Sequence, residues 1–207
     1  MAMNYASLAF TDAVRQMQEK FGSRKSYARM ELKSYVNGLT ENEIVFISER
    51  DSFYMATIGE NGYPYVQHRG GPRGFIKVLD VKRLGIIDYI GNAQYITLGN
   101  ITTNNKVALI MVDYPTRTRL KLYAKARIVE LNDDPALYSQ LDVEGSQFRP
   151  ERIMLFDVDA YSWNCPQYIT PRYTLEEINR AFASESEYIS QLEAEIKKLK
   201  ENPGAGE

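Results

Sequence analysis

The stretch His68–Phe75 (HRGGPRGF) has the most unusual chemistry in the sequence. Its three glycines let the backbone approach a ligand and expose N–H groups, and Arg69 and Arg73 add cationic donors. It is not a dinucleotide fingerprint, because the strand-like run FIKVLD follows where a helix is required, and it is not a P-loop, because no Gly-Lys-Ser/Thr follows. The stretch therefore predicts a backbone cradle for an anionic ligand, with a ligand-free glycine-rich hairpin as the alternative.

Three other segments carry groups suited to ligand binding. Gly91–Asn100 supplies Asn, Gln and Thr side chains, neutral groups that fit the edge of a polar heterocycle or phosphate oxygens. In a strand, Arg117, Arg119 and Lys121 would share one face and attract an anion. Trp163–Arg172 holds the only Trp and the only Cys, in a loop stiffened by two prolines. For the first two segments, the alternatives are a polar connection between strands and a strand face that merely faces solvent.

The composition argues against several classes of function. His68 is the only histidine and Cys165 the only cysteine, so the sequence offers no metal-ligand set, although a catalytic Cys–His pair stays open. A single cysteine allows no internal disulfide, which favours a reducing compartment. The net charge of -2 gives no basic excess for nucleic acid, and no apolar run is long enough to cross a membrane. The N-terminus lacks the pattern of a secretory signal, so we expect a cytoplasmic protein.

Helices are predicted over residues 5–50. Apolar residues three and four positions apart in FTDAVRQMQEKFG make one face of a helix that Gly22 can end. Thr40 and Glu43 have the spacing of a capping box ahead of a further helical stretch.

From residue 52 the pattern changes to short strands. SFYMATI and YVQHR predict a hairpin with Asn61-Gly62 as its turn. The further strand candidates are FIKVLD (75–80), RLGIIDYI (83–90), YITL (95–98), KVALIMVD (106–113), RLKLYAKARIVEL (119–131) and RIMLFDVDAYSW (152–163). Strands at this density, with no helix between most of them, predict an antiparallel barrel rather than a parallel doubly wound sheet.

Helical patterns return after the long strands. A short helix is expected at Asp133-Asp134-Pro135, and a second capping box at Thr174–Glu177 opens a helical tail that runs to about residue 201. The tail carries a narrow apolar stripe, formed by Ile189, Leu192, Ile196 and Leu199. The stripe can pack on the same subunit or across a dimer.

Taken in order, HRGGPRGFIKVLD, GNAQYITLGN, TRTRLKL and WNCPQYITPR resemble the flavin-nucleotide-binding proteins related to pyridoxamine 5'-phosphate oxidase, over roughly residues 40–175. The resemblance implies a mainly β fold with peripheral helices (α+β), built on a six-stranded antiparallel split β-barrel. It also implies FMN in a cleft between the two subunits of a homodimer. The expected parts are an N-terminal helical segment (1–45), the FMN-binding domain (46–172) and a C-terminal helical tail (173–207) that packs on the barrel or on the dimer partner.

The resemblance places the flavin contacts in all four segments and implies no metal ligand and no identified catalytic side chain. The expected FMN-binding residues are Arg69, Gly70, Gly71, Pro72, Phe75, Lys77, Asn92, Gln94, Thr97, Asn100, Arg119, Trp163, Gln167 and Arg172.

The chain departs from the family pattern where the oxidase holds the FMN phosphate. The Arg-Lys pair of the oxidase aligns near Ile96 and Thr97, and relatives often have Arg at Ala93 and His at Tyr168. Neutralisation of the phosphate is therefore expected from one of three arginines, Arg69, Arg73 or Arg119.

The resemblance implies an FMN-dependent oxidoreductase with an unidentified small-molecule substrate, in which hydride passes directly at N5 of the flavin. Two alternatives stay open. One is a non-catalytic flavin or haem carrier or sensor, and the other is a cofactor-free scaffold that binds a protein through its tail.

Overall fold

The computed structural model describes residues 4–33 and 37–201. The described elements, in chain order, are α1 (Tyr5–Ala9), α2 (Asp12–Lys20), α3 (Arg24–Lys33), α4 (Glu41–Ser48), β1 (Ser52–Ile58), β2 (Pro64–Gly70), β3 (Lys77–Asp80), β4 (Arg83–Tyr89), α5 (Ile96–Thr103), β5 (Lys106–Asp113), β6 (Thr118–Val129), α6 (Pro135–Leu141), β7 (Pro150–Asn164), α7 (Leu175–Ala181) and α8 (Ala183–Glu201). They fall into two compact units. The first holds the chain up to residue 113 together with 118–167, and the second holds 114–117 and the chain from residue 168.

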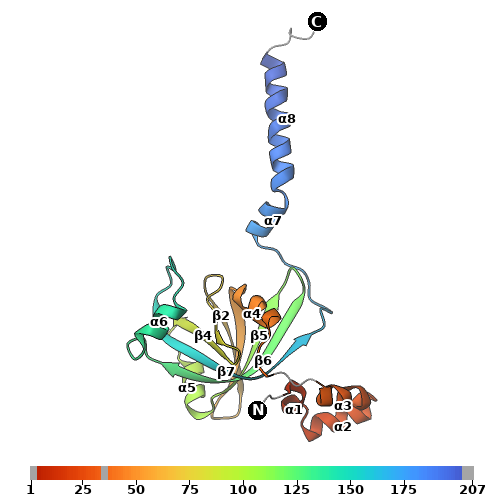
Figure 1. Ribbon diagram of the computed structural model, residues 1–207, viewed down its shortest axis with the longest axis vertical. Helices are drawn as coiled ribbons and strands as arrows, with labels where there is room; N and C mark the ends of the chain where they lie inside the picture. Colours follow the sequence, from red (N-terminus) through yellow and green to blue (C-terminus); the bar gives the residue numbers. More distant parts are fainter. Residues whose placement is uncertain (1–3, 34–36, 202–207) are drawn as a thin grey trace. The chain divides into compact units, whose positions relative to one another are not determined.

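The first unit is built on one antiparallel sheet with the strand order β2-β1-β5-β6-β7-β4-β3 (Figure 1). The prediction of a mainly antiparallel β fold with peripheral helices is confirmed. The sheet has seven strands rather than the predicted six, because the short β3 pairs with β4 and extends that edge. Strands β2 and β3 are consecutive in the chain but stand at opposite ends of this order.

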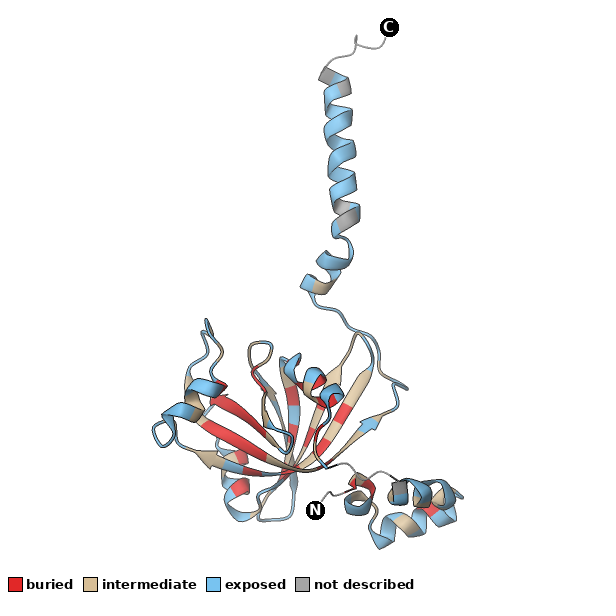
Figure 2. Cartoon of the chain, viewed as in Figure 1, coloured by how far each residue is buried: buried red, intermediate tan, exposed pale blue. Residues whose placement is uncertain are grey.

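Alternating burial along the strands explains the sheet. In β1, Phe53 and Met55 are buried while Tyr54 and Ile58 face outward, and β5 and β6 alternate in the same way. Figure 2 shows the buried residues gathered along the strands and on α4. The predicted hairpin of β1 and β2 is confirmed, with Gly62 in the left-handed region at φ 82°.

The prediction of a strand at YITL (95–98) is wrong, because helix α5 begins at Ile96. Tyr95 precedes it in the left-handed conformation, at φ 53°, and this turns the chain out of the extended path. Side-chain contacts then hold the helix on the sheet: the Thr97 hydroxyl bonds to Gln67, and the Asn100 amide donates to the Thr57 hydroxyl at 2.9 Å. These tertiary contacts outweigh the β preference of an Ile- and Tyr-containing run.

The helices of residues 5–50 are confirmed as α1 to α4, and the part at 34–36 lies outside the described residues. Thr11 caps α2, and Gly22, at φ 77°, follows its end as predicted. The ring of Tyr5 in α1 stacks on Tyr123 of β6 at 4.8 Å between centroids.

Helix α4 is tied to the far end of β7. The Glu43 carboxylate accepts hydrogen bonds from the Thr40 N–H at 2.8 Å and from the Trp163 indole N–H at 2.5 Å. Burial raises the pKa of Glu43, but hydrogen bonds from Thr40, Trp163 and Tyr161 outweigh it and bring that pKa below its ordinary value of 4.5.

We expect Trp163→Phe to lower the free energy of unfolding by about 1.5–3 kcal/mol at neutral pH, because it removes a donor from a buried carboxylate. A lowered folded-state pKa contributes stability above the unfolded value, and that contribution is lost as pH falls through the folded pKa. The cost of the substitution should therefore shrink below pH 4.5. Urea unfolding across this range measures it. In a Glu43→Gln background the same substitution should lose its pH dependence, and an unchanged dependence there would contradict the role of Glu43.

In the second unit, the Thr174 cap of α7 is confirmed: its backbone N–H donates to the Glu177 carboxylate at 2.7 Å. The chain bends at Phe182 and continues as α8. The prediction that Arg117 shares a strand face with Arg119 and Lys121 is wrong, since Arg117 sits in a turn at φ 55° and β6 starts at Thr118. Among the described residues, no helix is long and apolar enough to cross a bilayer.

Candidate functional site

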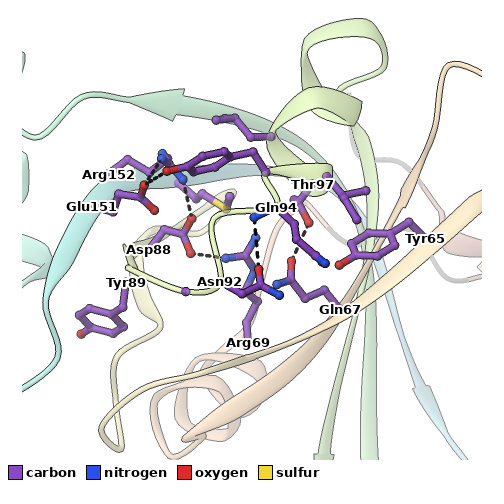
Figure 3. Close-up of a pocket in the computed structure, with 15 residues that line it drawn as sticks. Tyr65, Gln67, Arg69, Asp88, Tyr89, Asn92, Gln94, Thr97, Glu151 and Arg152 are labelled. Atoms are coloured by element: carbon purple, nitrogen blue, oxygen red, sulfur yellow. Dashed lines mark hydrogen bonds and ion pairs between the residues drawn. The ribbon is translucent and has the colours of Figure 1, made fainter.

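A small cavity of about 50 Å³ lies where β2, β4, β7 and the start of α5 meet (Figure 3). Strand β2 contributes Tyr65, Gln67 and Arg69 on one face, as its period of two requires. The remaining lining residues come from the end of β4, the loop 91–95, the first turn of α5 and the start of β7: Asp88, Tyr89, Gly91, Asn92, Gln94, Tyr95, Ile96, Thr97, Leu98, Glu151, Arg152 and Met154.

The charged residues of the cavity lining form one network centred on Asp88, which is 5% exposed. One Asp88 oxygen pairs with Arg69, and the other lies 3.4 Å from Arg152 Nη1. Arg152 also pairs with Glu151 at 2.7 Å, and its guanidinium stacks over the Tyr95 ring. Burial raises the pKa of Asp88, while the positive charges of Arg69 and Arg152 oppose that rise. Two arginines are therefore held at one cavity by a carboxylate that is costly to bury.

The loop between β4 and α5, which contributes to the cavity lining, has an unusual backbone. Ala93 and Tyr95 both adopt the left-handed conformation, at φ 58° and 53°, which side chains other than glycine seldom take. This loop leads directly into α5, so the unpaired N–H groups of the first helical turn lie at the cavity. Helix N-termini attract anions because of these N–H groups and the helix dipole. The loop thus positions backbone donors beside the two arginines.

A second hollow, open to solvent and of about 590 Å³, adjoins the cavity and shares Tyr65 and Ile96 with it. Its other lining residues come from the β1–β2 turn and from Asn100. Of the residues predicted from the sequence, the structure therefore brings Arg69, Asn92, Gln94 and Thr97 into one cavity. Asn100 lines the neighbouring hollow.

Apart from Arg69, the glycine-rich stretch lines neither of these hollows and instead shapes the backbone around Phe75. A Cβ on Gly71 would lie 2.6 Å from Cγ of Phe75, so the buried Phe75 ring occupies that space. Gly70 ends β2, Pro72 follows in the connection, and Lys77 begins β3 in a half-buried position. Close packing of a core ring is the visible reason for glycine at position 71.

The predicted residues late in the chain lie apart from the cavity lining. Arg119 donates to the Cys165 carbonyl at 2.8 Å, and its buried Nε has no hydrogen-bond partner within the described structure. Trp163 is bonded to Glu43, and Gln167 is exposed at the end of the first unit. Arg172 belongs to the second unit, where its guanidinium lies 5.0 Å from the Tyr114 ring.

Sequence reasoning missed Asp88, Glu151 and Arg152, although these residues make up most of the charge in the cavity. The sequence did contain a signal for Asp88. Asp88 interrupts the apolar run RLGIIDYI, and a charged residue inside a buried strand needs a partner.

One family of known proteins matches more than half of the chain. The family model of pyridoxamine 5'-phosphate oxidase matches residues 39–161. No curated protein matches the chain.

Among solved structures, a candidate pyridoxamine 5'-phosphate oxidase from Lactobacillus delbrueckii is 26% identical, with 61% of this chain and 95% of that chain covered and a TM-score of 0.47. A protein related to general stress protein 26 from Clostridium acetobutylicum is 19% identical over 66% of this chain and 93% of its own, with a TM-score of 0.43. The haem storage protein HutZ of Vibrio cholerae is 20% identical over 58% of this chain and 90% of its own, with a TM-score of 0.37.

Proposed function

The chain belongs to the pyridoxamine 5'-phosphate oxidase family, whose model matches more than half of its length, and from this premise we propose that it binds FMN and acts as an oxidoreductase. The observation that carries the proposal is the pair Arg69 and Arg152, held by Asp88 beside the N-terminus of α5 within the matched region. Such a set of donors suits a phosphate dianion.

The donors fit the phosphate of FMN in number and kind. Arg69 keeps a buried Nε without a hydrogen-bond partner among the described residues, so it has a donor to spare. The Thr97 hydroxyl and the amides of Gln94 and Asn92 add neutral groups at the same cavity. Of the three arginines considered for the phosphate, Arg73 is exposed on the surface, and Arg119, whose buried Nε also has no partner in the described structure, lies outside the cavity lining. Arg69 is therefore our choice for this role.

The rest of the cofactor needs more room than one chain provides here. A cavity of about 50 Å³ suits a phosphate and is too small for the flavin ring. We propose that a second copy of the chain completes the site, as a homodimer with the flavin between subunits. The outer face of β1 and β2 supports a dimer, because Tyr54, Ile58 and Val66 are exposed there on neighbouring strands.

Bound FMN would supply hydride transfer at N5, which no side chain can supply. The chain would bind the phosphate through Arg69 and Arg152 and orient the ribityl chain with neutral amides and hydroxyls. No residue needs to move a proton in this scheme.

Titration of the purified protein with FMN, FAD and riboflavin tests the proposal. We expect near-stoichiometric binding of FMN, weaker binding of FAD, and a loss of about 10-fold or more with riboflavin, which lacks the phosphate. Oxidation of a reduced nicotinamide by the FMN-loaded protein would support catalysis. If neither FMN nor FAD binds, the proposal is wrong. Uptake of haem in a parallel titration would instead favour a carrier, although the only histidine, His68, lies on the exposed face of β2 against Tyr54.

We expect no useful oxidation of pyridoxine phosphate or pyridoxamine phosphate. A second phosphate dianion needs its own cations, and leaving it unpaired in a partly desolvated cleft costs several kcal/mol. The helix in the corresponding place, α6, has Tyr138 and Ser139 but no Arg or Lys, and Asp133 and Asp134 precede it. Oxygen uptake by FMN-loaded protein measures the reaction, and turnover of about 1 per second or more would contradict this expectation.

A further inference from the structure

Helix α8 presents an apolar stripe that its own unit does not cover. Ile189, Leu192 and Ile196 are 54%, 39% and 51% exposed, and every α8 residue with a described side chain is exposed. The opposite faces of the helix are rich in Glu and Lys. A 19-residue helix with one exposed apolar stripe between charged faces is suited to pack against a second helix.

The spacing of the stripe fixes its heptad register. Ile189 and Leu192 are three apart and Leu192 and Ile196 are four apart, so isoleucine occupies position a and leucine position d. Leu199 takes the next d position in the sequence. β-Branched residues at a with leucine at d favour two parallel strands over higher oligomers.

We propose that α8 pairs with α8 of a second copy of this chain as a parallel two-stranded coiled coil. In this register Glu195 occupies position g and Lys200 position e of the following heptad. A parallel pair brings each Glu195 beside Lys200 of the other copy, twice by symmetry. The charges that flank the stripe are thus complementary to those of an identical helix.

The pair goes beyond the proposed function, since flavin binding does not require it. Two heptads are short for a coiled coil in isolation, because helix formation has a costly nucleus. Attachment of both helices to one assembly would raise their effective concentration and make a short pair sufficient. The competing occupant of the stripe is a surface of the same subunit.

Disulfide trapping distinguishes these occupants in the full-length chain. Leu192→Cys, made in a Cys165→Ser background, places two thiols against each other at a d layer of a parallel pair. Glu187→Cys is the matched control, on the outer f position of the same helix. We expect mild oxidation to link most Leu192→Cys protein into dimers, at least 10-fold faster than Glu187→Cys. Equal rates, or no link at position 192, would overturn the pairing. FMN titration of the same samples reports separately on the proposed function.

Charge exchange tests the parallel register. Glu195→Lys and Lys200→Glu, each added to the Leu192→Cys protein, put like charges together in self-pairs and opposite charges together in mixed pairs. In an equal mixture we expect heterodimers to exceed clearly the one-half share that random pairing gives. A random share would overturn the parallel g–e arrangement.

Discussion

Replacing Asp88 by Asn is expected to lower the free energy of unfolding of the flavin-free protein by about 3 kcal/mol, the low end of the range for breaking a buried ion pair. Arg69 then loses its only carboxylate partner among the described contacts, whereas Arg152 keeps Glu151. The cost of burying the carboxylate itself, seen in its raised pKa, is what keeps the loss at the low end.

FMN should restore much of this loss, because its phosphate would replace the missing negative charge. We expect FMN to bind Asp88→Asn about 1–2 kcal/mol more tightly, since Arg69 no longer has to leave a carboxylate to reach the phosphate. Thermal unfolding with and without FMN measures both effects. Asp157→Asn is the matched control: its partner Arg83 is half-exposed, so the loss should stay below about 1 kcal/mol and FMN should stabilise it like the unmodified protein. Equal gains from FMN in both variants would contradict a phosphate at Arg69.

Arg69→Met is expected to weaken FMN binding by about 10- to 150-fold, the equivalent of a charge-assisted hydrogen bond. Methionine keeps an unbranched apolar stem of comparable reach, and Asp88 remains paired with Arg152. The affinity should be measured by quenching of flavin fluorescence at a temperature where the variant is folded.

Two variants make this result specific. Arg127→Met lies on β6 with its side chain exposed, and it should leave FMN affinity unchanged. Arg119→Met removes the other arginine with a buried Nε that lacks a partner in the described structure. If Arg119→Met loses more affinity than Arg69→Met, the phosphate is bound in the region of Arg119 and our choice of Arg69 is wrong.

The sheet was predictable because its sequence signals are local. Alternating residues in KVALIMVD and the Asn61-Gly62 turn lead directly to β5 and to the first hairpin. Helix α5 was not predictable, because its start depends on the left-handed Tyr95 and on Thr97 and Asn100 reaching side chains of β1 and β2. No window of neighbouring residues contains that information.

The candidate site was predictable only in part for the same reason. Arg69 and the polar loop after Gly91 stood out by residue type, and they meet in the cavity. Asp88 and Arg152 lie in strands whose sequences have the apolar pattern of core strands. The two residues are 64 positions apart in the chain, and they become partners only through the pairing of β4 with β7. A charge within an apolar strand predicts a partner, but sequence alone does not say which one.

The position of β7 in the strand order has a consequence for how the protein is made. β7 joins two parts of the sheet, since it pairs with β6 on one side and β4 on the other. While the ribosome adds the roughly 70 residues from Tyr89 to Asp157, the last β7 partner of β4, about 3–14 s at typical speeds, β4 has only the short β3 paired beside it. The backbone edge of β4 that β7 later covers is therefore unpaired on the nascent chain for that whole interval. We therefore expect chaperones that protect this edge during translation to raise the yield of native protein.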